Sequence, residues 1–282
     1  MINTPFNYTG NKFKLLDQIL PEFDYNRKNF YDLFCGGGSV YTNIIDKFEI
    51  IYINDIIKDL IDIHKELIFN TEEFINKVIK LSPSNDNQEE FNKLRKEYNE
   101  NKEASKLFAL MLSSRNNLMR FNKKFLYNQT FGKRTFNNNT LLKINNFVNH
   151  LSKYKDKINF TNLSFENVNI NENSMVYIDP PYGYCVEDNK IISKQISDAG
   201  YNRYWKKEDE IKLYEYIKTI SNKCSFVMSN MYKCNEKTSY ICEKLINDGF
   251  NYKTINSNYT KVSKVNKDII EIIIKNFWIT KV

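Results

Sequence analysis

The sequence lacks the features that would suggest a metal site, an oxidising compartment or a membrane. Its five cysteines include no CxxC pair, and its two histidines, His64 and His150, lie far apart along the chain. These spacings give no basis for a structural zinc, and free thiols suit a reducing cytosol. No signal-peptide-like segment opens the chain, and the most apolar stretch, residues 269–279, is short and interrupted by Glu271 and Lys275. We therefore expect a cytoplasmic protein with no metal and no membrane association.

Acidic residues are absent from residues 104–155, a stretch that holds ten lysines and arginines. The whole chain has a net charge of +7, so the remainder is slightly acidic. Asparagine, glutamine and aromatic residues are interleaved with these cations. Cations that bind phosphates, together with amides and aromatics that contact bases, are the composition expected of a DNA-reading surface. The alternative is a solvated basic face, but the complete lack of acids favours a polyanionic partner.

A tetrapeptide with an acid, two prolines and an aromatic residue follows a predicted buried strand. Residues 175–178 are a short apolar run typical of a buried parallel strand, and Asp179, Pro180, Pro181 and Tyr182 come next. Because proline fixes φ and has no backbone N–H, the strand ends in a stiff turn whose carbonyls are left as acceptors. A carboxylate, a carbonyl and an aromatic face suit a planar ring with an exocyclic amino group. The alternative is a plain turn capped by a tyrosine.

A glycine-rich turn lies near the start of the chain. Residues 30–34 form a predicted strand that runs into Cys35 and three consecutive glycines, which let the backbone turn tightly and approach a ligand. The next predicted strand, residues 50–53, leads to Asp55, which lies 19 residues after Gly36. An acid about 20 residues beyond the first glycine is where nucleoside-binding α/β folds hold a ribose diol. The pattern predicts a nucleoside cofactor, although Asp55 could instead cap the following helix.

With these segments in place, the chain resembles the Dam-type (D12 class) DNA adenine-N6 methyltransferases, and within them the short phage-borne branch. The resemblance runs from about residue 5 to about residue 280. Its order is specific: an N-terminal cofactor segment, the glycine turn, a long insert and then the catalytic tetrapeptide. The matching segments are residues 8–12, 32–37, 54–55, 118–120, 130–134, 164–165 and 179–182.

The resemblance implies methyl transfer from S-adenosylmethionine to adenine N6, without a metal. Asp179 and the carbonyl of Pro180 would accept hydrogen bonds from the amino group, while Tyr182 would stack on an adenine flipped out of the duplex. For Phe165 a place in the core is the alternative, and for Asp32 a cap on the turn. The expected cofactor-binding residues are Tyr8, Lys12, Asp32, Phe34, Gly36, Asp55, Ser164, Phe165 and Asp179.

The resemblance also implies duplex DNA as the partner and GATC as the target sequence. Arg120 is expected to bond guanine O6 and N7, since a guanidinium can do so bidentately, whereas Lys124 is expected to bind phosphate. Arg115 stands where relatives often carry an aromatic wedge, so Leu118 or Phe121 is expected to take that role. The expected DNA-binding residues are Arg115, Asn116, Leu118, Arg120, Lys123, Lys124, Phe131, Lys133 and Arg134. A monomer in solution is expected; more than one copy on DNA and pairing with a restriction enzyme stay open.

The predicted fold class is α/β: a Rossmann-like S-adenosylmethionine-dependent methyltransferase sheet with an inserted, mostly helical DNA-recognition domain. Residues 1–57 plus 157–282 form the predicted catalytic domain, and residues 58–156 the insert. Residues 116–139 are expected to form a hairpin or irregular loop. Further strands are predicted at residues 158–160, 225–229 and 269–277. Helices are predicted at residues 13–20, 56–69, most of 72–115 apart from a loop at 82–87, 207–221 and 238–248.

Three other functions are compatible with parts of this pattern. A cytosine-N4 methyltransferase uses the same amino-group chemistry, but Asp rather than Ser before Pro-Pro-Tyr favours adenine. A non-catalytic DNA-binding relative would be expected to have lost Asp179 or Tyr182, and both are present. A nucleotide-dependent oxidoreductase would leave the basic insert unexplained.

Overall fold

The structure of the 282-residue chain is a computed structural model. It describes residues 1–122, 124–188, 190–196, 205–256 and 268–277, without the side chains of residues 193–195. The chain divides into two compact units, each built from three segments. The first unit comprises Met1–Phe13, Cys35–Asp46 and Asp55–Asn162, and the second comprises Lys14–Phe34, Lys47–Asn54 and Leu163–Val282. The predicted functional domains, a catalytic domain of residues 1–57 plus 157–282 and a DNA-recognition insert of residues 58–156, stay a prediction.

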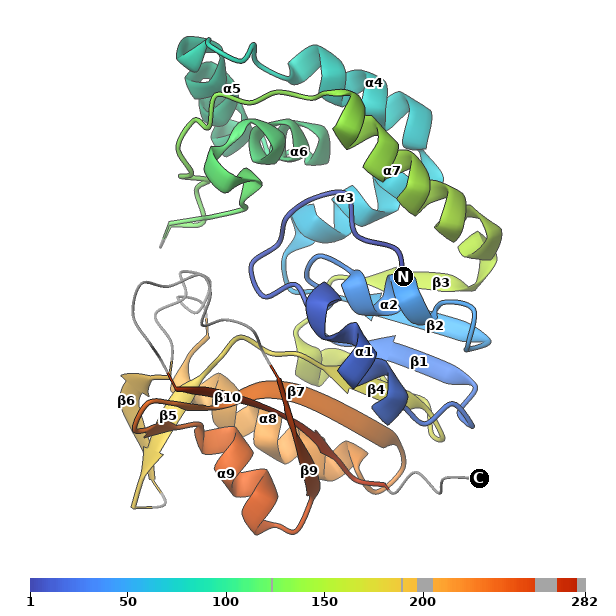
Figure 1. The fold of residues 1–282 in the computed structure, drawn as a ribbon, viewed down its shortest axis with the longest axis vertical. Coiled ribbons are helices and arrows are strands. Elements are labelled where there is room, and N and C mark those ends of the chain that lie inside the picture. Colours follow the sequence, from blue (N-terminus) through green and yellow to red (C-terminus); the bar gives the residue numbers. More distant parts are fainter. Residues whose placement is uncertain (123, 189, 197–204, 257–267, 278–282) are drawn as a thin grey trace. The chain divides into compact units, whose positions relative to one another are not determined.

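The second unit is built on a mostly parallel sheet whose strand order includes β2-β1-β4-β7-β10-β9 (Figure 1). Strand β1 pairs in parallel with β2 and β4, and β4 with β7, whereas β10 runs antiparallel to β7 and β9. The strands are β1 (Asn29–Asp32), β2 (Ile50–Asn54), β4 (Met175–Ile178), β7 (Ser225–Cys234), β9 (Asn251–Ile255) and β10 (Ile269–Lys275), with the short β8 (Lys237–Thr238) paired to β7. This sheet confirms the predicted α/β class.

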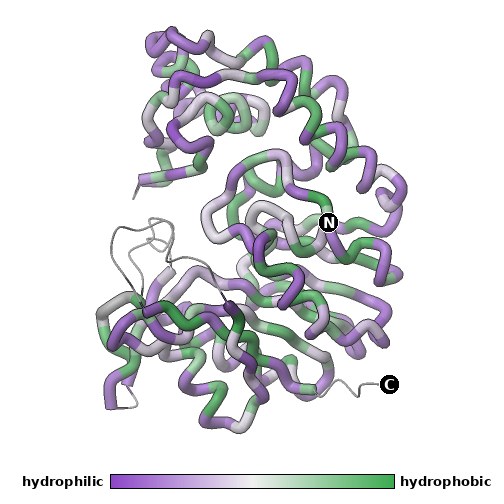
Figure 2. Tube along the Cα trace, in the orientation of Figure 1, coloured by the Kyte–Doolittle hydropathy of each residue, from purple (hydrophilic) through white to green (hydrophobic). Residues whose placement is uncertain are grey.

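Each face of this sheet is covered by different elements, because successive strand side chains point to opposite sides. On one face, Val176 and Phe226 pack in the same core cluster as Leu213 of α8 (Lys207–Ile220), and α9 (Tyr240–Asn247) joins them. On the other face, the ring of Phe23 lies 5.5 Å from that of Tyr177. Phe23 follows the short helix α1 (Leu16–Ile19). Figure 2 shows β10 as a largely hydrophobic run, and its residues Ile272 and Ile274 belong to the core cluster.

A separate hairpin follows the tetrapeptide in the second unit. It consists of β5 (Tyr184–Glu187) and β6 (Lys190–Gln195), which pair antiparallel. An isolated bridge between Cys185 and Ser239 connects this hairpin to the residue that precedes α9. The sequence pattern did not predict these two strands.

The first unit is mainly helical. Its most buried helix is α6, whose residues from Leu107 to Ser113 are all buried. Two helices of this unit, α5 and α7, begin with an asparagine cap; the side chain of Asn87 accepts from the backbone N–H of Glu90 at the start of α5, and that of Asn137 from the N–H of Thr140 at the start of α7. The elements are α2 (Ser39–Ile44), α3 (Lys58–Phe69), α4 (Thr71–Leu81), α5 (Gln88–Glu100), α6 (Ala104–Ser113), α7 (Asn138–Leu151) and β3 (Ile158–Thr161). In the part of the chain that is described, no helix combines the length and apolarity needed to cross a bilayer.

Candidate functional site

The glycine turn of the first unit is held from several sides. Gly36 has φ +49°, and a Cβ there would lie 2.7 Å from Cε1 of Tyr8, so this position requires glycine for two independent reasons. The backbone N–H of Gly36 donates to Oδ2 of Asp55 (3.0 Å). Lys12 is also buried, and its Nζ donates to the carbonyl of Gly10 (3.3 Å). The N-terminal segment therefore lies directly against the turn. The structure brings together Tyr8, Gly36 and Asp55, three of the residues that were expected to bind the cofactor.

Asp55 is a buried carboxylate with two backbone donors. Its Oδ1 accepts from the N–H of Ile57 (2.9 Å), while Oδ2 accepts from Gly36. Burial raises the pKa of Asp55 to about 6, against the effect of these two hydrogen bonds. Helix α3 begins at Lys58 and its N-cap is Ile57, so Asp55 makes a local turn and is not the N-cap of that helix. Its carboxylate lone pairs that are not used by these two N–H groups can still accept hydroxyl donors.

His64 of α3 supports the same turn, a role that the sequence analysis did not assign. Its Nε2 lies 2.9 Å from the carbonyl oxygen of Gly36, and its Nδ1 lies 2.9 Å from the hydroxyl of Tyr41. Because a carbonyl can only accept, Nε2 carries the proton and Nδ1 accepts from Tyr41. Burial lowers the pKa of His64 to about 4, so the ring is neutral at pH 7. Gly36 is thus held at its N–H by Asp55 and at its carbonyl by His64.

In the second unit, the tetrapeptide follows β4 and its acid joins a buried polar cluster. Oδ1 of Asp179 accepts from Oγ of Ser229 (3.3 Å), which is also hydrogen-bonded to the hydroxyl of Tyr177 (2.7 Å). The pKa of Tyr177 is raised well above its usual range, first by burial and then by the carboxylates of Asp179, Asp32 and Glu271. The carboxyl groups of Asp32 and Asp179 therefore both act on one buried hydroxyl.

The aromatic residue of the tetrapeptide is buried in this structure. Tyr182 is 5% exposed, and its hydroxyl donates to the carboxylate of Glu271 on β10. The next residue, Gly183, has no room for a side chain, since a Cβ would lie 1.8 Å from Oε2 of Glu210 on α8. That same carboxylate oxygen accepts from the indole N–H of Trp205. Neither Glu271 nor Glu210 lies in a sequence motif that predicted a site residue.

Phe34 and Phe165, both expected at the cofactor, lie together in the second unit. Their ring centroids are 5.6 Å apart, and Trp205 lies 5.9 Å from Phe34 and 5.8 Å from Phe165. Phe165 belongs to the buried core cluster, as its alternative role predicts, while Phe34 is only partly buried. Ser164, which precedes Phe165, donates through its Oγ to the carboxylate of Glu166. Trp205 therefore completes a group of three rings.

The expected DNA-binding residues lie in an irregular segment of the first unit that follows α6. Two isolated bridges, Ser114 to Phe131 and Phe121 to Tyr127, shape it into a hairpin-like loop. The guanidinium of Arg120 is exposed, and its Nε donates to Oδ1 of Asn128 (3.1 Å).

Other members of the DNA-binding set also lie at or near the surface. Leu118 and Phe131 are partly buried, whereas the exposed members are Arg115, Asn116, Lys124, Lys133 and Arg134. The ring of Phe131 packs 5.3 Å from that of Phe91. Lys123 lies outside the described residues. The cations of this set are therefore presented to solvent in the described part of the loop.

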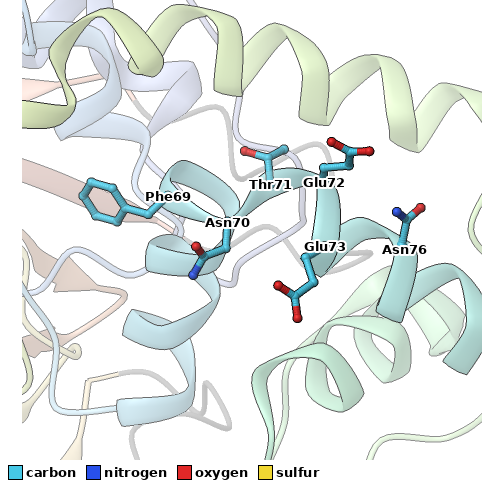
Figure 3. Close-up of a pocket in the computed structure, with 6 residues that line it drawn as sticks. All are labelled: Phe69, Asn70, Thr71, Glu72, Glu73 and Asn76. Atoms are coloured by element: carbon cyan, nitrogen blue, oxygen red, sulfur yellow. The ribbon is translucent and has the colours of Figure 1, made fainter.

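A surface pocket elsewhere contains none of these residues. Figure 3 shows it at the junction of α3 and α4, lined by Phe69, Asn70, Thr71, Glu72, Glu73 and Asn76. Its two glutamates carry the same sign of charge as DNA phosphates, so this pocket does not suit DNA binding. Among the described residues there is also no group of histidines, cysteines and acids that could hold a metal ion.

The sequence profile of the D12 class N6 adenine-specific DNA methyltransferases matches residues 8–261. The match covers most of the chain and includes the glycine turn, the loop after α6 and the tetrapeptide. The chain therefore belongs to this family.

Curated relatives agree with the family assignment. The modification methylase StsI of Streptococcus sanguinis is 29% identical over 98% of this chain and 43% of its own length. The Type II methyltransferase M.FokI of Planomicrobium okeanokoites is 30% identical over 82% of this chain and 36% of its own length. This chain thus spans about two fifths of these longer relatives. The Type II methyltransferase M.MjaIII of Methanocaldococcus jannaschii is 27% identical over 97% of this chain and 99% of its own length.

Proposed function

We propose that this protein transfers a methyl group from S-adenosylmethionine to N6 of an adenine in duplex DNA. The observation that carries the proposal is Asp179, an acid directly after a buried parallel strand, hydrogen-bonded to Ser229 within a family of adenine-specific enzymes. The names of the relatives support a role as the modification enzyme of a restriction-modification system.

The buried acids fit the proposed cofactor. S-adenosylmethionine supplies, when bound, an electrophilic methyl group on a positively charged sulfur. Asp55 has acceptor capacity suited to a ribose diol, and its position next to Gly36 leaves the backbone of the turn close to any bound ligand. Asp32 is 1% exposed, and it acts with Asp179 on the hydroxyl of Tyr177, so the second unit brings two acids close together, which suits a cationic ligand. Tyr8, Lys12, Phe34, Ser164 and Phe165 complete the proposed cofactor set.

Asp179 and the carbonyl of Pro180 are proposed to act on the amino group itself. The N6 lone pair of adenine is delocalised into the ring, so the free amine is a poor nucleophile. Hydrogen bonds from N6–H to two fixed acceptors would position the nitrogen and favour a tetrahedral geometry. Because Pro180 has a fixed φ and is followed by a second proline, its carbonyl is held by a stiff backbone. A base inside the duplex cannot reach these acceptors, so the adenine is proposed to flip out, with Tyr182 as its stacking partner.

The proposed target sequence is GATC, read by the loop after α6. Arg120 is the residue proposed to contact guanine, because its guanidinium is exposed and already held by Asn128. Lys124, Lys133 and Arg134 are proposed to bind phosphates. If Arg120→Ala loses affinity equally for cognate and non-cognate duplexes, it binds phosphate and the basis for GATC is removed.

The decisive experiment is a methyl-transfer assay with labelled cofactor and unmethylated duplex, followed by digestion to nucleosides. The expected product is N6-methyladenine, and Asp179→Ala should abolish transfer while leaving duplex affinity within about threefold, since the carboxylate acts on the reacting amino group. Label in N4-methylcytosine would establish the alternative cytosine chemistry. Duplex binding without any transfer would show a non-catalytic DNA-binding relative.

A further inference from the structure

Helix α5 holds the segment of residues 127–131 at every second residue. Three side chains of α5 are spaced four residues apart, and therefore lie on one face of the helix, and each contacts this segment. The pairs, helix residue first, are Phe91 with Phe131, Arg95 with Gln129, and Asn99 with Tyr127. Four helical residues rise about 6 Å and two residues of extended chain span about 6.6 Å, so the two spacings match along the contact. The segment is thus fixed in register against α5.

The contact between Asn99 and Tyr127 has the hydrogen-bond pattern of a β-ladder. Oδ1 of Asn99 accepts from the backbone N–H of Tyr127 (2.7 Å), and its Nδ2 donates to the carbonyl of the same residue (3.1 Å). An amide side chain can make both bonds because it carries a donor and an acceptor, as a peptide group does. Tyr127 is 1% exposed and Gln129 is 8% exposed, whereas Asn128 between them is only partly buried. The two contacts with α5 therefore leave Asn128 on the outer side of the segment.

Asn128 makes three hydrogen bonds with the exposed Arg120. Its backbone N–H donates to the carbonyl of Arg120 (3.1 Å), its Oδ1 accepts from Nε (3.1 Å), and its own carbonyl accepts from Nη2 (3.0 Å). A guanidinium has five N–H groups, and the two bonds to Asn128 use one on Nε and one on Nη2. Because the guanidinium is planar, these two bonds fix its plane, and the outer edge formed by Nη1 and the second N–H of Nη2 faces away from Asn128. That edge carries the pair of donors that a bidentate contact with guanine O6 and N7 requires.

We propose that Asn128 is a positioning residue for base reading, which presents the outer edge of the Arg120 guanidinium to a guanine while α5 keeps Asn128 in place. A free arginine side chain loses rotamer entropy when it binds, and a side chain that is ordered beforehand loses less. A neutral amide suits this role, because a carboxylate would hold the guanidinium but repel the phosphates, and there is no acidic residue from residue 104 to residue 155. The proposal rests on the proposed function, since it takes Arg120 as the residue that reads the duplex.

The test measures discrimination, defined as the ratio of the affinities of the full chain for a GATC duplex and for an AATT duplex with the same flanks, both with S-adenosylhomocysteine present. Arg120→Ala should lower this ratio about tenfold or more, since a bidentate contact with guanine is lost. Asn128→Ala should lower it about fivefold and leave the slope of log affinity against log salt unchanged, because no phosphate contact is lost. Asn128→Asp keeps the acceptor at Oδ1, so it should keep the ratio within about twofold while the affinity for both duplexes falls through repulsion of the phosphates.

A double-mutant cycle shows whether Asn128 acts through Arg120. In the Arg120→Ala background, Asn128→Ala should change the ratio less than about twofold, since the side chain that Asn128 positions is gone. The matched control is Asn76→Ala, which removes an exposed amide of α4 in the same unit and should change neither the ratio nor the salt slope. A wild-type ratio in Asn128→Ala, a full loss in the Arg120→Ala background, or a lower melting temperature with equal loss of affinity for both duplexes would overturn the positioning role. A ratio near one for the wild type itself would instead overturn the proposed reading of GATC, on which the inference rests.

Discussion

Cofactor binding should depend on pH through Asp55, whose carboxylate is proposed to hold the ribose diol. Burial raises the pKa of Asp55 to about 6 in the ligand-free protein. Roughly a tenth of the carboxyl is then ionised at pH 5 and roughly nine tenths at pH 7. Two hydroxyl donors stabilise the ionised form, so the apparent affinity for the cofactor should fall about tenfold from pH 7 to pH 5.

The raised pKa of Asp55 also makes the free energy of unfolding of the ligand-free protein depend on pH. The carboxyl titrates at 3.8 when unperturbed and at about 6 in the fold, so the folded state favours the protonated form. Its contribution to the free energy of unfolding is therefore largest below pH 3.8 and is lost as pH rises through 6, a change of about 3 kcal/mol. The ligand-free protein carries this cost at pH 7, and hydroxyl donors from the cofactor would offset part of it.

The measurement is calorimetric titration with S-adenosylhomocysteine between pH 5 and pH 7.5, since that ligand has no group that titrates in this range. The matched variant is Asp55→Asn, which keeps the shape but cannot ionise. It should bind about 10- to 100-fold more weakly at pH 7, because a charge-assisted hydrogen bond is lost and one backbone N–H meets an amide donor. Its affinity should not change with pH. Glu210, whose pKa burial raises to about 7, is retained in this variant, so a pH slope that persists there would refute the assignment to Asp55.

Two further substitutions test the supports of the site. Gly36→Ala places a Cβ 2.7 Å from a ring carbon of Tyr8 at φ +49°, so it should lower both the melting temperature and the affinity for the cofactor. The matched control is Gly249→Ala, at φ +87°, where nothing lies within 4 Å of the added Cβ. It should show only the backbone cost of about 1 kcal/mol. Equal losses of stability in the two variants would show that Tyr8 does not restrict the turn. Tyr182→Phe removes the hydroxyl that donates to Glu271 but keeps the ring, so thermal unfolding should show a loss of about 1–3 kcal/mol while duplex affinity is retained. An unchanged melting temperature would contradict that estimate.

Much of the second unit could be predicted from the sequence because its strands are short, apolar and bounded by polar or proline residues. The predicted strand at residues 175–178 is β4, and the strands predicted at 30–34 and 50–53 are β1 and β2 with ends shifted by one or two residues. The predicted helices at residues 207–221 and 238–248 correspond to α8 and α9. In each case the local pattern and the burial in the fold agree.

The elements that the sequence analysis missed have weak local patterns. Helix α7 (Asn138–Leu151) begins with two asparagines and has only three buried residues, Ile144, Phe147 and Leu151. Strand β9 has the burial of an edge strand, with three consecutive exposed residues, and it is defined by its pairing with β10. Pairing partners far along the chain determine such strands, and a single-sequence pattern does not contain that information.

In the candidate site, too, local sequence patterns predicted some residues, whereas others are placed only by the fold. Local motifs predicted Gly36, Asp55 and Asp179, because glycine turns and strand ends have recognisable residue types. The groups that hold them come from distant parts of the chain: His64 from α3, Ser229 from β7 and Glu271 from β10. No spacing rule connects such residues to the motifs. What they share is chemical, since each is a buried polar side chain, and a buried polar group needs a partner.

These distant groups bear on how the proposed chemistry would work. The chain at the tetrapeptide is held at three points by three elements: Asp179 by Ser229, Tyr182 by Glu271, and the backbone N–H of Tyr184 by the buried carboxylate of Glu210. Two prolines stiffen the backbone between the first two points. Acceptors that are fixed before the adenine arrives need no reorganisation at the moment of transfer, which is the condition under which hydrogen bonds to the amino group lower a barrier. If Asp179 and the Pro180 carbonyl are the acceptors, as proposed, this rigidity assigns the movement of the proposed base capture to the DNA.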